Sequence, residues 1–332
     1  SFADGNYMKK GNISLFIPHL GCPHKCSFCN QNTITGKQTQ PSADDIRAAV
    51  ETALKKKNYD YEIAFFGGSF TAIDREYMLS LLKAAYDYVK DGRVNGIRIS
   101  TRPDCIDEEV LDILKKYGVT SIELGAQSMD DEVLRANFRG HTAEDVEYAS
   151  RLIKSYGFEL GLQMMTGLYL DTDEKAIETA KKLIALSPDT IRIYPTVVLK
   201  NTYLAKLYED EIYKPQTVDD AANLCTKIVP MFEKAGIRVI RLGLHSSPEL
   251  KKNMIAGAFH DSFGEIVKSR YMLNKILKYP PADYEIVVNS KSVSQLKGQQ
   301  KRNIYFLMEE GYNIKVTVND KVAVGDIKIV RR

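Results

Sequence analysis

The sequence predicts an α/β fold, a partial, open parallel barrel of the (β/α)6 type followed by a small C-terminal α+β appendage. Short apolar runs rich in β-branched and aromatic residues alternate with longer amphipathic segments up to about residue 250. Strands separated by helices need crossover connections, which are right-handed and give parallel sheets. Six or seven such units are too few for a closed eight-stranded barrel, so we expect an open one.

Seven apolar runs are expected to be the barrel strands, in chain order ISLFIPH (13–19), YEIAFFGG (61–68), GIRISTRP (96–103), SIELGAQS (121–128), LGLQMMTG (160–167), TIRIYPTVV (190–198) and IRVIRLGL (237–244). Helical patterns at 42–57 and 75–90 follow the first two strands. Ser42, with Asp45 three residues later, predicts a capping arrangement at the start of the first helix.

The pattern changes near residue 250, so we predict a barrel domain over 8–250 and a C-terminal extension over 251–332 that covers the substrate. The extension is expected to hold strands at 284–289, 314–318 and 322–330 and a helix around 291–310. No internal repeat or low-complexity linker interrupts the chain.

Composition limits the class of protein. The 332 residues are 44% hydrophobic and 27% charged, which is typical of a soluble enzyme with a large core. The net charge of +3 gives no strong nucleic-acid signal, although a basic stretch at 291–302 is either a local phosphate contact or a solvated helix surface. No apolar run is long enough to span a membrane. Five cysteines, three of them close together, argue against a secreted disulfide framework, so we expect a cytoplasmic protein.

Three cysteines follow the first predicted strand in the segment GCPHKCSFCNQ (21–31). In α/β barrels the chemistry lies in the loops that follow the strands, and this loop extends to about Pro41. Three thiolates that leave one metal position open suit a four-iron cluster with one differentiated iron. His24 offers a fourth ligand for zinc, and structural thiols are a third interpretation.

The spacing C-x3-C-x2-C, with Phe28 directly before the last cysteine, resembles that of the radical S-adenosylmethionine (SAM) superfamily. The resemblance implies a [4Fe-4S] cluster and SAM bound at its fourth iron. The cluster ligands it implies are Cys22, Cys26 and Cys29.

The resemblance also assigns residues to the SAM site. A glycine pair that ends the second strand, here Gly67 and Gly68, is implied to approach the methionine amino group. Ser69 stands where an acid is common in the superfamily, which weakens a side-chain contact but not the backbone one. The motif STRPD ends the third strand, and its Ser100 and Arg102 share one face of that strand.

The fourth strand ends in GAQS and is followed by NFRGH, a pattern similar to the radical coproporphyrinogen oxidases and the Elongator catalytic subunit. That similarity implies that Gln127 meets the adenosyl ribose and that Arg139 holds the methionine carboxylate. The alternative for Arg139 is a surface ion pair. Gln163 stands where an acidic ribose ligand occurs in the family, and His141 is either a cofactor contact or a buried helix cap.

From about residue 13 to residue 270 the chain resembles stand-alone relatives of the Elongator catalytic subunit, on STRPD, GAQS, RGHT, MMTGL, IRIYPT and AGAFHDSFGE. The gap between the first two cluster cysteines is shorter than in that subunit. No room remains for an acetyltransferase domain, so we do not expect acetyl-coenzyme-A-dependent carboxymethylation of wobble uridine by this chain alone.

Stand-alone members of this branch include a queuine lyase, so the predicted function is radical cleavage of queuine to 7-aminomethyl-7-deazaguanine in queuosine salvage. A tRNA-modifying enzyme of the same branch is the alternative, and a non-catalytic zinc-binding module is the third. The expected partners are a small modified nucleobase and a reductant such as flavodoxin or ferredoxin. The residues expected at the substrate come from strand ends and the segment after the barrel, namely Tyr194, Arg241, His245 and His260.

Overall fold

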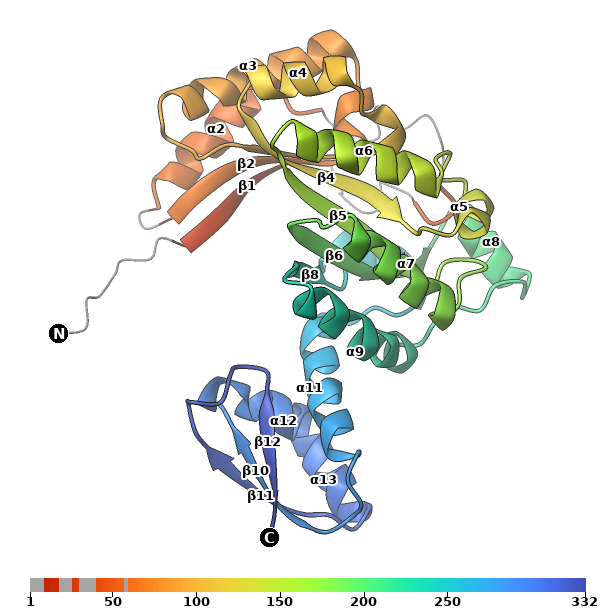
Figure 1. Cartoon of the computed structure of the whole chain (residues 1–332). Coiled ribbons are helices and arrows are strands. Elements are labelled where there is room, and N and C mark those ends of the chain that lie inside the picture. Colours follow the sequence, from red (N-terminus) through yellow and green to blue (C-terminus); the bar gives the residue numbers. More distant parts are fainter. Residues whose placement is uncertain (1–8, 18–25, 30–39, 57–58) are drawn as a thin grey trace, which may run out of the picture.

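The computed structural model describes residues 9–17, 26–29, 40–56 and 59–332. Seven parallel strands form one curved sheet in the order β1-β2-β3-β4-β5-β6-β8 (Figure 1). Their bounds are β1 (Lys9–Ile17), β2 (Tyr59–Gly67), β3 (Ile97–Thr101), β4 (Val119–Gln127), β5 (Glu159–Thr166), β6 (Thr190–Pro195) and β8 (Arg238–Leu242). β1 and β8 remain unpaired with each other, which confirms the open barrel.

Helices cover the outer face of this sheet (Figure 1). They are α2 (Ala43–Leu54), α3 (Arg75–Lys90), α4 (Glu108–Lys116), α6 (Ala143–Ser155), α7 (Asp173–Ala185) and α9 (Val218–Lys234). The predicted capping arrangement is confirmed, because the Ser42 hydroxyl accepts from the Asp45 amide while the Asp45 carboxylate accepts from the Ser42 amide. No helix in the described part of the chain combines the length and apolar composition that a membrane crossing requires.

Short elements follow the carboxyl ends of the strands. They are η1 (Phe70–Ala72), η2 (Pro103–Cys105), α5 (Asp131–Ala136), β7 (Val197–Leu199), α8 (Tyr203–Glu209), α10 (Pro248–Asn253) and β9 (Met254–Gly257). β7 and β9 form an antiparallel pair, which ties the segment after β8 back to the barrel.

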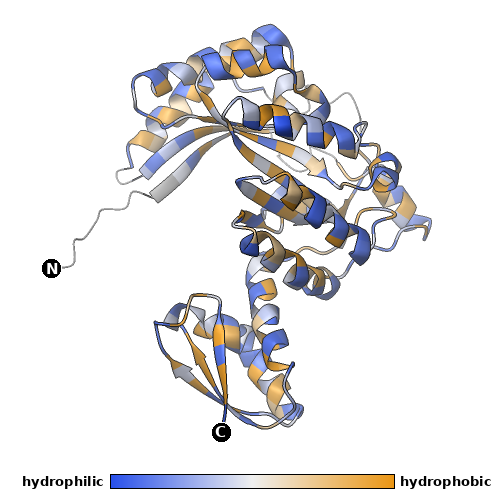
Figure 2. Ribbon diagram, viewed as in Figure 1, coloured by the Kyte–Doolittle hydropathy of each residue, from blue (hydrophilic) through white to orange (hydrophobic). Residues whose placement is uncertain are grey.

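Alternate side chains of each strand point to opposite faces of the sheet. One set, exemplified by Leu15, Phe65 and Ile99, is fully or almost fully buried in the core beneath the helices. The other set faces the inside of the barrel and is largely polar or aromatic. Figure 2 shows the resulting alternation of hydrophilic and hydrophobic residues along the strands and helices. The inner face is therefore the surface on which a site is built.

The C-terminal unit contains the sheet β11-β10-β12, formed by β10 (Asp283–Val288), β11 (Asn313–Val318) and β12 (Ile327–Arg331). A single helix was expected around 291–310, but the structure has four short helical elements there. They are η3 (Ser290–Ser292), α12 (Val293–Lys297), η4 (Gln299–Lys301) and α13 (Arg302–Glu309). Gly298 interrupts the expected helix with a φ of 72°, and Gln300 and Lys301 are also left-handed. The last strand starts at Ile327 instead of 322 because a turn around Gly325 precedes it.

Helix α11 (Phe263–Ile276) joins the two units, and the C-terminal unit lies at its far end (Figure 1). Phe263 and Val267 belong to the barrel core, whereas Met272 and Ile276 belong to the core of the C-terminal unit. Both cores therefore meet on this helix. The boundary at 250 and 251 and the covering role of the extension stay predictions.

Candidate functional site

Residues 26–29 of the cysteine segment are fixed to the barrel through Ser27. The Ser27 amide donates to the Asn137 carbonyl (3.1 Å), and the Ser27 hydroxyl donates to Asn137 Oδ1 (2.7 Å). The Ser27 carbonyl accepts from the Leu204 amide at 2.8 Å. Ser27 and Asn137 are both completely buried. The backbone between Cys26 and Cys29 is thus held on α5 and α8, whereas Cys22 lies outside the described residues.

Arg139 reaches this segment from the loop after α5. Its Nη1 donates to Cys26 Sγ (3.0 Å) and its Nη2 donates to the Gly125 carbonyl (2.6 Å). Its guanidinium carbon lies 5.9 Å from the centre of the Phe28 ring. Arg139 is only 6% exposed, so the surface ion pair considered as its alternative does not occur. The guanidinium therefore joins the cysteine segment to the end of β4.

Arg102 supports Arg139. Its Nε and Nη2 donate to the two Asp104 carboxylate oxygens at 2.9 and 3.0 Å, and Nη2 also donates to the Arg139 carbonyl. Its backbone amide donates to the Ser69 hydroxyl, which also lies 2.7 Å from Thr101 Oγ1. Ser69 therefore links the ends of β2 and β3.

The glycine pair lies at the end of β2, as the family pattern places it. Gly67 has a φ of +117°, which L-residues rarely adopt. A Cβ atom at Gly67 would lie 2.4 Å from the Ile17 carbonyl oxygen, and the Gly68 amide donates to that same oxygen at 3.1 Å. Both glycines leave backbone accessible at the strand end, where a ligand can approach it.

Several buried polar atoms around Arg139 have no hydrogen-bond partner within the described residues. They belong to the ends of β3 and β4 and to the loop after α5, namely Ser100 Oγ, Arg102 Nη1, Gln127 Oε1, Arg139 Nε and His141 Nδ1. Buried polar atoms normally find partners, so this cluster indicates a polar ligand. Gln127 has a φ of 65°, a strained conformation often found at functional sites.

These residues fit the expected SAM site. Donors from Arg102 and Arg139 suit a carboxylate, and Gln127 suits a hydroxyl, while the thiols of Cys26 and Cys29 suit iron. Burial is the main cause that lowers the pKa of His141 to about 4, and the charge of Arg139 acts in the same direction. His141 is therefore neutral near pH 7, and its Nε2 lies 3.1 Å from the Ala126 carbonyl oxygen.

The inner face carries a charge network that was not predicted from the sequence. Its signal in the sequence is an acid, Glu123, and an arginine, Arg192, within otherwise apolar strands. Glu123 of β4 is 1% exposed and accepts from Arg192 Nε (2.7 Å) and Nη2 (2.9 Å) of β6. Glu123 also accepts from Arg98 Nη1 (3.3 Å) and Gln163 Nε2 (3.0 Å). The Gln163 side chain is thus hydrogen-bonded to Glu123, and the assignment of Gln163 to the ribose stays a prediction.

The four residues expected at the substrate come from β6, from β8 and from the loops that follow β8, and the charge of Arg241 acts on Tyr194. Tyr194 lies on the inner face beside Arg192, and burial raises the pKa of its phenol. Arg241 donates to the carbonyls of Gly243 and Leu244, both at 2.9 Å, and so closes its own turn. Their roles stay predictions.

The two histidines lie in separate loops. His245 is exposed after β8. His260 Nδ1 accepts from the Ser262 amide at 3.0 Å, which fixes the start of α11. His260 thus has a local structural contact, and a substrate role for either histidine stays a prediction.

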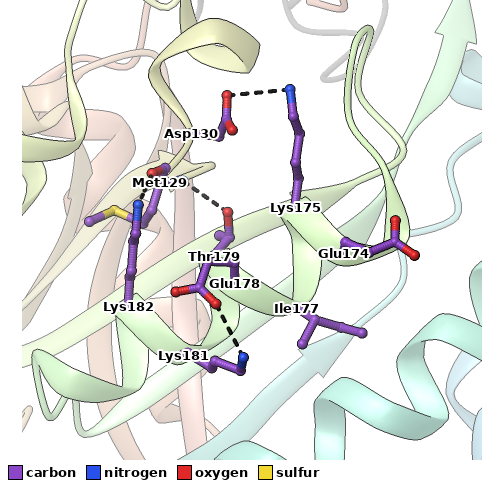
Figure 3. A pocket seen from close by; sticks show the side chains of 9 residues that line it. All are labelled: Met129, Asp130, Glu174, Lys175, Ile177, Glu178, Thr179, Lys181 and Lys182. Atoms are coloured by element: carbon purple, nitrogen blue, oxygen red, sulfur yellow. Dashed lines mark hydrogen bonds and ion pairs between the residues drawn. The ribbon is translucent and has the colours of Figure 1, made fainter.

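A cavity of about 460 Å³ lies on the outer helix α7 and contains none of the predicted site residues (Figure 3). Its charges pair with one another, for example Lys175 with Asp130 (3.7 Å) and Lys181 with Glu178 (3.2 Å). We therefore assign no ligand to it.

Comparisons with known proteins agree with this geometry. Residues 16–183, about half of the chain, match the radical SAM superfamily, and residues 188–272 match the Radical_SAM C-terminal domain. The archaeal Elp3 of Methanocaldococcus infernus has a similar fold, with a TM-score of 0.66 and 23% identity over 82% of this chain and 65% of that one.

Curated relatives point to the same branch. Human Elongator complex protein 3 is 30% identical over 67% of this chain and 46% of its own length. The tRNA uridine(34) acetyltransferase of Dehalococcoides mccartyi is 25% identical over 61% of this chain and 52% of its own length. An uncharacterized protein of Methanocaldococcus jannaschii is 32% identical over 60% of this chain and 65% of its own length. The chain thus spans between about half and two thirds of these relatives.

Proposed function

Because the chain belongs to the radical SAM superfamily, in its Elongator-like branch, we propose that it modifies a nucleobase carried by tRNA. The observation that carries this proposal is the match to tRNA uridine(34) acetyltransferases and Elongator proteins over three fifths or more of this chain. The relatives are longer, so their complete activity is not transferred. The proposal concerns the radical step on a base.

The superfamily implies SAM and a [4Fe-4S] cluster as cofactors. When bound and reduced by one electron, they supply a 5′-deoxyadenosyl radical that abstracts a hydrogen atom from the substrate. The cluster would be held by Cys22, Cys26 and Cys29. Arg139, which contacts Cys26, would orient the methionine carboxylate.

Other residues hold and shield the cofactor site. Gln127 and Ser100 offer buried polar atoms without partners. The ring of Phe28 covers the Arg139 guanidinium and would limit the access of water to it. Gly67 and Gly68 would let SAM approach the backbone at the end of β2. A flavodoxin or ferredoxin is the expected source of the electron.

Cleavage of free queuine is the second candidate. The net charge of +3 favours it, because weak phosphate attraction suits a small base better than a polyanion. In that case the radical step would lead to loss of the cyclopentenediol and release of 7-aminomethyl-7-deazaguanine.

The cofactor part of the proposal is tested by anaerobic reconstitution with iron and sulfide. We expect a brown protein with about four irons per chain. Cys22→Ala, Cys26→Ala and Cys29→Ala should each remove the colour, whereas Cys225→Ala, at a completely buried thiol in the core, serves as the control. A colourless wild type with stoichiometric zinc would instead support the zinc-binding module.

The substrate part is tested by offering bulk tRNA and free queuine to the reduced protein in parallel. We expect tRNA to stimulate formation of 5′-deoxyadenosine, with a new nucleoside in the digested tRNA by mass spectrometry. Turnover should fall steeply with added salt, since phosphate contacts release counterions. Turnover of queuine alone, with little salt dependence, would reject tRNA and establish the second candidate.

A further inference from the structure

Two aromatic side chains lie next to each other on the inner face of the barrel. Phe16 of β1 and Phe66 of β2 are partners in the register, and their ring centres are 6.2 Å apart. Their neighbours Leu15 and Phe65 belong to the core under the helices, so Phe16 and Phe66 face inward. Phe16 is 36% exposed, and Phe66 is half-buried. These rings form an apolar surface that the described residues leave partly open.

A fixed cation adjoins this surface. The Arg192 guanidinium carbon lies 5.4 Å from the centre of the Phe66 ring. Both Nε and Nη2 of Arg192 are held by the buried Glu123 carboxylate, so the guanidinium cannot turn freely. The Glu123 charge also balances that of Arg192. The two rings are tilted by 43° to each other, so a planar group can stack on one of them and contact the other with its edge. The surface is rigid and locally near neutral, which favours a planar uncharged group over a free anion.

The position of this surface suits the radical step. Phe66 directly precedes Gly67, and Tyr194 lies two residues beyond Arg192 toward the carboxyl end of β6. Both strands end at the rim where Arg139 meets Cys26. A group stacked on either ring would thus be just below the place where the cofactors are expected.

We propose that Phe16, Phe66 and Arg192 form a stacking platform for the planar base of the substrate, with Tyr194 at its upper edge. Stacking on aromatic rings and guanidinium planes is a general way to hold an unpaired base. The inference rests on the proposed function but does not depend on whether the base belongs to tRNA or is free. Both sources share the planar heteroaromatic ring that the platform would contact.

The test measures equilibrium binding to the reconstituted protein with SAM. The probes are an RNA anticodon stem-loop and free queuine, and the variants are Phe16→Leu and Phe66→Leu. We expect each variant to bind the productive probe about ten-fold more weakly, as for loss of a base–aromatic stack. Phe66→Tyr keeps the ring and should bind nearly as wild type. Thermal unfolding checks that the variants are folded.

Phe306→Leu is the matched control, since Phe306 is 39% exposed on α13 in the C-terminal unit. Weakening by Phe16→Leu and Phe66→Leu, but not by Phe306→Leu, supports the platform, and the affected probe identifies the source of the base. If the wild type binds the stem-loop, and Phe16→Leu, Phe66→Leu and Phe306→Leu bind it as tightly as the wild type, the platform is wrong while the proposed function stands. If wild type binds neither probe, both are refuted. Phe16 lies on the edge strand β1, so its variant gives a result even if Phe66→Leu fails to fold.

Discussion

The substitution Glu123→Gln removes a negative charge from the inside of the barrel and preserves the shape of the side chain. Glu123 is 1% exposed and contacts Arg98 and Arg192 as ion pairs. Arg98 keeps two other carboxylates, Glu62 at 2.9 Å and Glu159 at 3.0 Å. Within the described residues, Arg192 has no second ion-pair partner. The variant therefore leaves Arg192 as an unbalanced, largely buried cation.

Breaking a buried ion pair by removing one partner costs about 3–5 kcal/mol of unfolding free energy. We expect about 3 kcal/mol for Glu123→Gln, because the amide oxygen still accepts a hydrogen bond. Glu159→Gln is the matched control. Its side chain is 29% exposed and Arg98 retains other acids, so that change should cost about 1 kcal/mol or less. Urea unfolding followed by far-ultraviolet circular dichroism measures both values.

The double variant Glu123→Gln/Arg192→Met separates charge from packing. Removing both charges should recover most of the stability lost in Glu123→Gln, because no buried cation then lacks a partner. The reasoning is refuted if Glu123→Gln costs no more than Glu159→Gln. It is also refuted if the double variant is less stable than the single one.

Three further outcomes are expected. Gly67→Ala should destabilise the fold by about 1–3 kcal/mol more than Gly92→Ala in urea unfolding, because both positions have positive φ but only Gly67 approaches a carbonyl, that of Ile17. Arg139→Ala should keep the cluster but weaken SAM binding in calorimetry by roughly 1.5–3 kcal/mol, and unchanged binding would contradict its assignment. His141 has a lowered folded-state pKa, from 6.5 to about 4, so its contribution to stability is present above 6.5 and is lost as the pH falls toward 4. Between pH 7 and pH 5, the free energy of unfolding should therefore fall by about 2 kcal/mol more in the wild type than in His141→Gln. The same pH profile in both proteins would show that His141 does not titrate in this way.

The barrel could be predicted because its signal is local. Each strand and helix carries its own periodicity, and the capping pair Ser42 and Asp45 lies within one turn. The break at Gly298 was missed because an isolated glycine in a helical pattern does not by itself show a left-handed conformation. The cysteine spacing and the glycine pair were equally visible, since each is a short motif beside a strand end.

The inner face was harder to predict because its contacts join distant parts of the chain. Glu123 meets arginines on β3 and β6, which lie 25 and 69 residues away in sequence. Gly161 is explained by contacts of the same kind, since a Cβ there would lie 2.8 Å from Glu123 Cγ and 2.9 Å from Thr190 Oγ1. Periodicity shows which residues share a face of a strand, but the curvature of the sheet decides which of them meet across the barrel.

Arg102 shows how one residue can serve the scaffold and the site together. The sequence motif assigns it to the cofactor, and the structure shows that Asp104 neutralises it while its Nη2 supports the Arg139 carbonyl. Its Nη1 is buried and has no partner within the described residues, so one donor remains for a ligand. Arg139 in turn contacts Cys26. The ends of β3 and β4 and the cysteine segment are thereby linked through two arginines, and a ligand carboxylate at this point would complete the hydrogen bonds that the protein alone leaves open.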